Sequence, residues 1–463
     1  MDTVSFAEDT AKTALKKGCD KAEVFIKTAK RLSVEAKDNA VEALESSRDF
    51  GMALKVIKKQ RLGFAFTTSP DRIADIINDA LQGADWTAPD EYVDIPDFRP
   101  ASEVLVIDEN IKNTKEDDII KNALLLEKAA LDFDTKIKKV RAAEIAIATA
   151  KTTIVNSKGI NISYESGYIT ASVSALASDG QDNQMGWDFA ISRRLSDVDF
   201  ILIARSASKK AIDLLGAKKI SAVKVPVILD SSVASEFLDI LSASLSAEAV
   251  QKKRSFLAGK AGKKIMSPLV NIIDDGIMPW GTGTKPVDDE GVPAMKKTIV
   301  SGGMLQGFIH NTYTANKEGV MSTGNASRKS FKGLPNIEIT NLYIEPRMRQ
   351  GSGVRSESTC LPDRQAHTET EKGKDLIKSV SKGLLILEAM GVHTANPVSG
   401  DFSIGISGLW IEGGKIVYPV KEAVMSGNIL ELFKRIEGVG HDLRFYGKIG
   451  TPSLLIGQMD ISA

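Results

Sequence analysis

Residues that could do acid–base or metal chemistry are few in this 463-residue chain, and they are scattered along it. Asp288, Asp289 and Glu290 follow one another directly. Consecutive side chains of a strand point to opposite faces, so these carboxylates cannot all converge on one metal ion or one reacting atom. We therefore predict a structural role for the run, in a turn, as acceptors of backbone N–H groups or as partners of Arg328.

The four histidines are also dispersed. We expect a partly buried, hydrogen-bonded side chain at His310, and loop or turn positions at His367 and His441. His393 follows a predicted helix end at Gly391 and precedes a glycine-rich run, which makes it the best placed of the four for a cleft. Zinc peptidases hold their metal with histidines at short spacing, so no local zinc site and no catalytic residue are predicted. A site assembled from distant residues stays open.

Glycine is dense in two runs of the C-terminal half that are otherwise rich in β-branched and aromatic residues. One run spans 396–415 and includes Asp401, Gly405 and Gly408, and the other spans 288–328 in three pieces. Glycine lets another backbone approach a strand closely, because it has no Cβ. Together the two runs resemble the TldD/PmbA family, described as modulators of DNA gyrase and as zinc-peptidase subunits. The similarity covers essentially the whole chain.

One branch of that family carries His-Glu-x-x-x-His on a helix early in the C-terminal half and a cysteine near the C-terminus. The two histidines of such a motif bind Zn²⁺, and the glutamate acts as the base toward metal-bound water. The corresponding helix here, 231–250, contains no histidine, and no cysteine follows Cys360. The chain therefore resembles the PmbA (TldE) branch, which keeps the fold and lacks the metal site.

The resemblance implies a metal-free subunit of a two-component cytoplasmic metallopeptidase that cleaves unstructured peptides, such as leader peptides and antitoxin-like proteins. No cofactor is expected in this chain, zinc is expected in a TldD-like partner, and a homodimer is expected in isolation. The residues expected to contact a peptide are Asp289, Glu290, Asn325, Arg328, His393, Asp401, Gly405 and Gly408. The region of Gly405, Gly408 and 413–414 is the predicted strand edge for an added peptide strand.

Two other functions stay open. One is a self-sufficient metallopeptidase, with a metal site built from His393 or His310 and acids such as Asp289. The other is a regulatory binding protein that acts on a DNA enzyme such as gyrase. Lys+Arg and Asp+Glu number 60 each, and this balance argues against nucleic-acid binding, because duplex binding needs a surplus of cations.

The composition, 43% hydrophobic and 26% charged, is that of a globular protein. Two cysteines are too few for a disulfide scaffold, which predicts a reducing, cytoplasmic compartment. The first residues are acidic, so no signal peptide is expected. No apolar run reaches the roughly 20 residues of a membrane span, so no membrane contact is expected.

Hydrophobic spacing predicts the elements that position these residues. Helices are predicted at 7–18, 69–83, 114–133 and 200–216. Strands are predicted at 22–28, 31–36, 51–57, 62–67, 140–148, 152–155, 160–164 and 168–176. The order repeats in two similar units, 1–85 and 114–216, joined by a connector, 86–113.

The predicted fold is α+β. An N-terminal domain, 1–220, is expected to be a curved antiparallel sheet with helices on one side, and a C-terminal domain, 221–463, to be β-rich and barrel-like. In the second domain a buried strand at 226–229 precedes the 231–250 helix. A further helix is predicted over 373–390, from the spacing of Leu376, Val380, Leu384 and Leu387.

Overall fold

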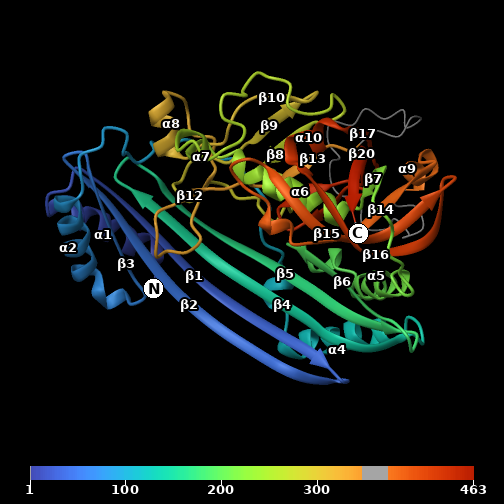
Figure 1. Cartoon of the computed structure of the whole chain (residues 1–463). Coiled ribbons are helices and arrows are strands. Elements are labelled where there is room, and N and C mark those ends of the chain that lie inside the picture. Colours follow the sequence, from blue (N-terminus) through green and yellow to red (C-terminus); the bar gives the residue numbers. More distant parts are fainter. Residues whose placement is uncertain (1, 347–373, 463) are drawn as a thin grey trace, which may run out of the picture.

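The computed structural model describes residues 2–346 and 374–462. The strands of the first half are β1 Lys21–Lys37, β2 Ala40–Lys58, β3 Arg61–Thr67, β4 Ile137–Asn156, β5 Asn161–Ser178 and β6 Asn183–Ser192. Its α-helices are α1 Thr3–Lys16, α2 Ile73–Trp86, α3 Glu109–Asn113, α4 Glu116–Leu131 and α5 Phe200–Asp213. The strands form one antiparallel sheet in the order β3-β2-β1-β4-β5-β6, which curves across the molecule (Figure 1).

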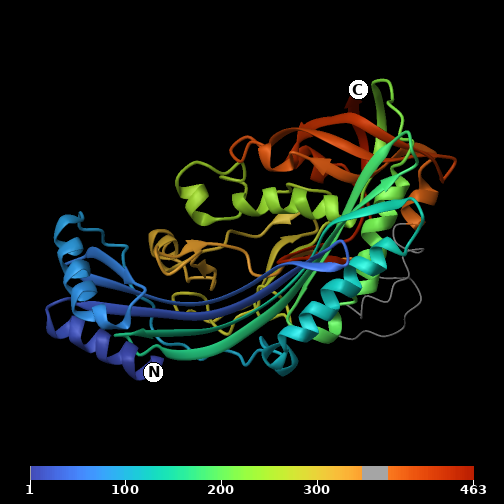
Figure 2. The same cartoon turned by 90° about the horizontal axis from the view of Figure 1, so that it is seen from below.

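The alternating direction of the side chains along β1 explains why helices cover only one face of this sheet. Val24 lies in an apolar cluster with residues of α1 and α2, whereas its neighbour Phe25 lies in a different cluster, against Val287 and Phe331 of the second half. Successive side chains of a strand point to opposite faces, so the two clusters mark the two faces of the sheet. Figure 2 shows the helices outside the curve and the second half of the chain inside it. The predicted curved sheet with helices on one side is confirmed.

Four strands are much longer than predicted, and one of them, β2, has 19 residues where only 51–57 was predicted. The other three are β1 with 17 residues, β4 with 20 and β5 with 18, and each of these three joins two segments that the sequence pattern separates. The predicted breaks fall near polar residues such as Lys30 and Thr149, where the sheet is partly open to solvent. Backbone pairing with β2 on one side and β4 on the other carries β1 through this region, so side-chain polarity does not end the strand.

The second half contains a closed barrel. Its strands are β7 Val223–Leu229, β8 Ile272–Asp275, β9 Lys296–Ser301, β10 Met304–Leu305, β11 Ala326–Ser327, β12 Asn336–Ile337, β13 Leu342–Ile344, β14 Lys382–Met390, β15 Asp401–Glu412, β16 Lys415–Asn428, β17 Ile436–Val439, β18 Arg444–Tyr446, β19 Ile449–Thr451 and β20 Leu454–Ser462. Its α-helices are α6 Ser231–Ser244, α7 Ala247–Gln251, α8 Thr312–Glu318, α9 Lys374–Ser379 and α10 Ile429–Lys434. Strands β16, β15, β14, β7 and β20 are neighbours in that order, and β16 pairs back with β20. The barrel-like expectation is therefore also confirmed.

The helix predicted over 373–390 is wrong for most of its length, because α9 ends at Ser379 and β14 follows. Leu384 and Ile386 belong to the main core cluster, while Leu385 packs on the other face, in a cluster with Ile228. A strand that is buried on both faces has a continuous apolar run, and such a run shows no strand period in the sequence. No helix within the described ranges is both long and apolar enough to cross a bilayer.

Gly405 and Gly408 lie inside the barrel wall. Their strand, β15, pairs with β14 on one side and with β16 on the other. The predicted free edge at Gly405 and Gly408 is therefore wrong, because the backbone groups of β15 are already used in the sheet. A Cβ on Gly408 would lie 2.0 Å from the carbonyl oxygen of Leu385 in β14, so glycine is needed for close strand contact at this position.

Gly408→Ala should therefore destabilise the barrel by about 3 kcal/mol, because the added methyl group forces the backbone of β14 to move. Gly405→Ala is the matched control. Its Cβ would approach only the flexible side chain of Met390, at 3.3 Å, and should cost under about 1 kcal/mol. Urea unfolding followed by tryptophan fluorescence measures both. Equal midpoints for the two variants would contradict this account.

Candidate functional site

Helix α6 forms one wall of a cavity of about 1070 Å³. The helix starts at Asp230, whose carboxylate accepts a hydrogen bond from the Ser232 N–H at 3.0 Å. Its apolar side is buried in the barrel core through Phe237, Leu238 and Leu241. The residues of α6 that line the cavity are Ser232, Ser235, Glu236, Asp239, Ser242 and Ala243.

The opposite wall is aromatic and comes from the last strand of the curved sheet. Trp187 and Phe189 of β6 line the cavity, and their rings stack at a centroid distance of 5.7 Å. Phe189 also contacts the ring of Tyr446, at 5.7 Å. The cavity thus lies between the two halves of the chain, with a hydroxyl- and carboxyl-bearing helix facing a flat apolar surface.

One strand edge opens into this cavity. β14 pairs with β15 along its length, but with β7 only over Leu384–Ile386. The residues after that point, 387–390, line the cavity. Among the described residues no strand pairs with 387–390 on the β7 side. Backbone N–H and C=O groups on such an edge are available to an extended chain.

Three carboxyl groups that line the cavity have raised pKa values. Burial, with a smaller contribution from Asp239, raises the pKa of Glu236 to about 7. Burial also raises the pKa of Asp239 and of Glu388, and for Glu388 nearby Lys210 partly opposes the shift. The described residues contain no ion pair to any of these three carboxyl groups. Lysines of the cavity have other contacts, since Lys448 pairs with Glu338 at 3.3 Å.

The groups on α6 do not fit a zinc site. Zinc in proteins is held mainly by imidazole nitrogen and thiolate sulfur, with carboxylate as an additional ligand. The α6 side of the cavity offers only serine hydroxyls and two carboxyls, and burial favours the protonated form of both carboxyls. Within the part of the chain that the structure describes, no three His, Cys, Asp or Glu side chains are grouped to hold a metal ion.

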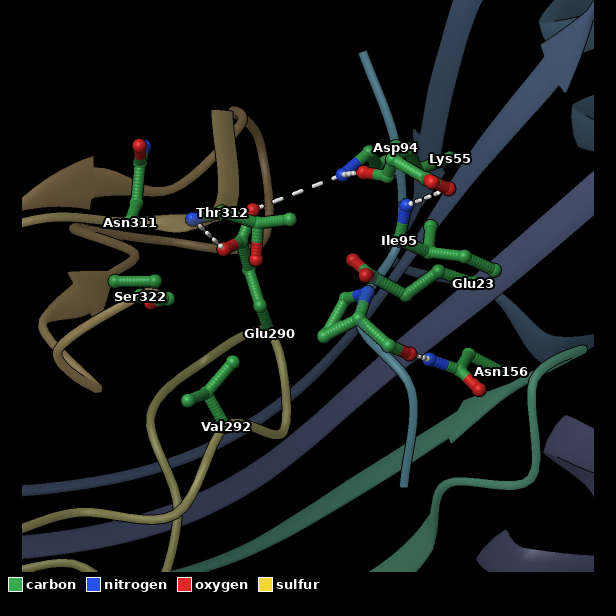
Figure 3. A network of polar contacts seen from close by, with 12 residues as sticks. Glu23, Lys55, Asp94, Ile95, Asn156, Glu290, Val292, Asn311, Thr312 and Ser322 are labelled. Carbon is green, nitrogen blue, oxygen red and sulfur yellow. Dashed lines mark hydrogen bonds and ion pairs between the residues drawn. The ribbon is translucent and has the colours of Figure 1, made fainter. Parts of the chain in front are cut away.

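Four of the sequence-predicted contact residues meet elsewhere, in a buried polar junction between the sheet and the second half. The Asp289 carboxylate accepts the Arg328 N–H at 2.7 Å and pairs with Lys285 at 2.9 Å. The Glu290 carboxylate lies between the Lys55 ammonium, 3.7 Å away, and the Thr312 N–H, 2.9 Å away (Figure 3). The predicted role of the acidic run as an acceptor of backbone N–H groups is confirmed.

Arg328 pairs with a different acid from the one predicted. Its guanidinium donates to Glu23 of β1 at 2.8 Å, and the two side chains are 1% and 0% exposed. Asn325 lies nearby and donates to the carboxylate of Asp274 at 2.9 Å. Asp289, Glu290, Asn325 and Arg328 are therefore brought together, but by internal partners, and none of them lines the α6 cavity.

Burial sets the protonation of this junction. It raises the pKa of Glu23, against the attraction of Lys55 and Arg328. Burial and the charge of Glu290 raise the pKa of Asp288 to about 8, although three backbone N–H groups oppose the rise. Burial alone would raise the pKa of Asp289 too, but Lys285 and the Arg328 N–H lower it on balance.

Two more cations, the buried Arg193 and the partly buried Arg444, join the sheet to the second half. Arg193, beside the end of β6, donates to the carbonyl oxygens of Gly281, Thr282 and Thr284 at 2.7 to 3.0 Å. Arg444 of β18 pairs with Asp188 of β6 at 2.8 Å. Burial lowers the pKa of Arg193 to about 10. These contacts hold β6 in place as a wall of the cavity.

The remaining predicted residues lie apart. Asp401 is exposed at the start of β15 and accepts hydrogen bonds from Asn428 and Ser399, and neither it nor Gly405 nor Gly408 lines the cavity. His393 lies in the 3-10 helix Val392–Thr394, and its side chain is outside the described part. His367 and Cys360 also fall outside the described residues.

His310 is buried more fully than predicted. Its Nε2 lies 3.7 Å from a carboxylate oxygen of Glu318, and burial lowers its pKa despite that charge. Its Nδ1 has no described hydrogen-bond partner. The prediction of a hydrogen-bonded side chain is supported by a hydrogen bond between His310 and the Thr314 backbone, although Nδ1 has no partner among the described residues.

Sequence reasoning missed the acids of the cavity. Glu236 and Asp239 lie three residues apart and so share one side of α6. A pair of acids at this spacing, on a helix with many serines and an apolar opposite side, was a usable signal. Glu388 could not be found in this way, because its segment was predicted to be helical.

Arg328→Met should destabilise the protein by about 3–5 kcal/mol, because it leaves the buried Glu23 carboxyl without its hydrogen-bonded cation and with only the charge of Lys55 nearby. The double variant Glu23→Gln/Arg328→Met should recover a large part of this loss. Lys12→Met breaks an exposed pair with Glu8 and should cost under about 1 kcal/mol. Chemical unfolding compares the variants, and a double variant no better than the single one would show that the charge of Glu23 is not the cause.

Glu236→Gln should raise thermal stability at alkaline pH but not at acidic pH. The ordinary pKa of this carboxyl is 4.5 and its folded value is about 7, so the folded state keeps a proton that the unfolded state loses. The contribution of this carboxyl group to the free energy of unfolding is therefore fully present below pH 4.5 and is lost as the pH rises through 7. Glutamine mimics the protonated form.

We expect the glutamine variant to melt roughly 1–3 °C higher than the parent at pH 8, with the difference shrinking toward pH 5. The control, Glu248→Gln on α7, removes a surface pair with Lys252 and should show no such pH-dependent gain. A difference in melting temperature between Glu236→Gln and the parent that does not change with pH would contradict the raised pKa of Glu236.

Comparison with known proteins places the chain in a family. Residues 222–463 match the model of a PmbA/TldA metallopeptidase C-terminal domain, 109–215 match its central domain and 22–84 match its domain 1. A metalloprotease PmbA homolog from Buchnera aphidicola is 27% identical over 450 residues, covering 95% of this chain and 92% of that protein.

Solved structures agree with this result. A Thermotoga maritima protein described as a modulator of a DNA gyrase has a TM-score of 0.88 and 25% identity, with 99% of each chain covered. TldE from Thermococcus kodakarensis shares the fold, with a TM-score of 0.86, 22% identity and coverage of 99% of this chain and 100% of that chain. The chain belongs to the PmbA/TldD metallopeptidase family.

Proposed function

We propose that this chain is the metal-free, cytoplasmic subunit of a two-component peptidase, and that its α6 cavity holds an unstructured peptide for cleavage at a zinc site in a TldD-like partner. The observation that carries the proposal is the composition of α6. This helix faces a peptide-sized cavity, and in place of histidines it presents Ser235, Glu236 and Asp239. These groups can bind a peptide but do not offer the ligands that zinc requires.

The strand edge supports peptide capture. A peptide laid along 387–390 of β14 would form backbone hydrogen bonds that do not depend on its sequence. We propose this edge as the site of peptide-strand addition, in place of the edge that the sequence pattern predicted at Gly405 and Gly408. The stacked rings of Trp187 and Phe189 across the cavity would contact apolar side chains of the same peptide.

The size of the cavity also supports a peptide ligand. Sites for small molecules have volumes of about 300–1,000 Å³, and this cavity, of about 1070 Å³, is slightly larger than that range. Leader peptides and antitoxin-like proteins are the substrates that we propose, since an extended chain can use both the strand edge and the aromatic wall.

The test is a peptidase assay on an unstructured peptide. The chain alone should leave the peptide uncut, and mixing it with a zinc-bearing TldD-like paralogue should produce cleavage. Ala243→Trp fills the cavity from an exposed position on α6, and should lower turnover by the mixture at least roughly tenfold. Leu125→Trp, at an exposed position of α4, is the control and should leave turnover unchanged.

Thermal melts show whether each variant is folded. Full turnover with Ala243→Trp would exclude the α6 cavity as the peptide site. Cleavage by the purified chain alone, abolished by a chelator, would overturn the assignment as a metal-free subunit.

A further inference from the structure

The lysines that line the α6 cavity already have contacts within the chain. Lys421 pairs with Asp182 at 3.3 Å, and Lys448 is held by the ion pair described above. The ammonium group of Lys210 lies over the ring of Trp187, 5.8 Å from the ring centre. These cations are therefore engaged and leave little positive charge for the acids of the cavity.

Three acids of the cavity have no cation of their own. Glu338 and Glu422 each pair with a lysine. The part of the chain that the structure describes provides no cation within ion-pair distance of the other three, which are Glu236, Asp239 and Glu388. Burial and the charge of Asp239 raise the pKa of Glu236, and no described cation contributes to it. The cavity thus carries negative charge without compensation and favours a cationic ligand.

A buried hydroxyl group in the wall also lacks a partner. Ser407 of β15 lines the cavity and is 8% exposed, and its hydroxyl forms no hydrogen bond within the described residues. It lies directly opposite Glu388 in the pairing of β14 with β15, while its neighbour Ile406 belongs to the barrel core. Ser407 and Glu388 therefore project from the same side of the sheet, into the cavity. A buried polar group without a partner is costly, so this wall fits a polar ligand.

We propose that the α6 cavity binds an arginine side chain of the peptide, between the two acids of α6 and the aromatic wall. A guanidinium group forms paired hydrogen bonds with carboxylates and stacks on aromatic rings. The rings of Trp187 and Phe189 supply such a surface, and their faces attract a cation. Because a nearby cation stabilises a carboxylate, arginine would offset the burial that raises the pKa of Glu236 to about 7.

The free strand edge brings such a side chain to α6. β7 ends where the Asp230 N–H donates to the carbonyl oxygen of Ile386 at 3.1 Å, and α6 starts at the next residue, Ser231. A peptide paired with 387–390 would take the place beside β14 that β7 leaves, next to α6. Successive side chains of the peptide point to opposite faces, so one register position directs its side chain into the cavity. This inference rests on the proposed function and adds the side chain that the peptide carries.

A divalent metal ion fits the same acids less well. Such an ion needs several ligand side chains around one point. Within the ranges that the structure describes, no three His, Cys, Asp or Glu side chains are grouped in this way.

Binding of matched peptides to the purified chain tests the inference. The probe is a fluorescently labelled, unstructured peptide with one arginine, and its matched control has citrulline at that position, with nearly the same shape and no charge. The dissociation constant of the arginine peptide, measured by fluorescence anisotropy, should be at least roughly tenfold lower, because citrulline cannot form charge-assisted hydrogen bonds with the carboxylates.

Variants of α6 show whether its acids cause this preference. Glu236→Gln/Asp239→Asn removes both charges and should reduce the preference for arginine over citrulline to less than about twofold. Glu248→Gln breaks a surface pair with Lys252 and, as the control, should keep the preference. Asp239→Lys reverses one charge and should favour a peptide with glutamate over a copy with glutamine. Thermal melts check that each variant is folded.

Equal dissociation constants for the arginine and citrulline peptides would overturn the inference, and so would a preference that survives in Glu236→Gln/Asp239→Asn. Cleavage by the mixture with a TldD-like paralogue separates this result from the proposed function. If both peptides are cut with equal KM, the arginine preference is refuted and the peptidase function stands. If the arginine peptide binds more tightly but neither peptide is cut, the arginine site stands and the peptidase function is refuted.

Discussion

Cations that are buried or partly buried and that bridge the two halves of the chain are the constraint on which the rest of the structure depends. Arg328 meets Glu23, Arg444 meets Asp188, and Arg193 meets a group of backbone carbonyls. A charge that leaves water without its partner is costly, so each of these contacts permits only a narrow range of positions for the sheet over the barrel. Apolar contacts alone would allow more sliding, because the hydrophobic effect is not directional.

This fixed placement creates the cavity. Arg444 and Arg193 hold β6, and β6 carries the aromatic wall opposite α6. The cavity is therefore a property of the relative placement of the two halves and does not belong to either half alone. The acids of α6 keep raised pKa values because the aromatic wall and the barrel together exclude part of the water around them. The same placement of the sheet over the barrel thus brings together the ion pairs of the junction and buries the carboxyl groups of the cavity.

The sequence predicts the fold class well and the site only in part. Alternation along β1 separates Val24 from Phe25, and this pattern is local, so it can be read without a structure. The strand at Leu384 was missed because it is buried on both faces, and such a strand has no alternation of apolar and polar residues in its sequence. Asp289 was correctly predicted to accept backbone N–H groups from its turn-like context. The cavity could not be predicted, because Glu236 faces residues that lie far away in the chain and meet it only after the halves assemble.

The long sheet also has a consequence for biosynthesis on the ribosome. Glu23 and its cation Arg328 are separated by 305 positions. At a translation rate of 5–20 residues per second, a nascent chain emits Glu23 roughly 15 to 60 seconds before Arg328. During that interval the β1–β2 ribbon has emerged with its carboxyl group uncompensated and the inner face of the sheet uncovered. During that time only water or a chaperone can solvate the Glu23 carboxylate and cover the inner face of the sheet. An ion pair between residues close together in the sequence would not have this delay.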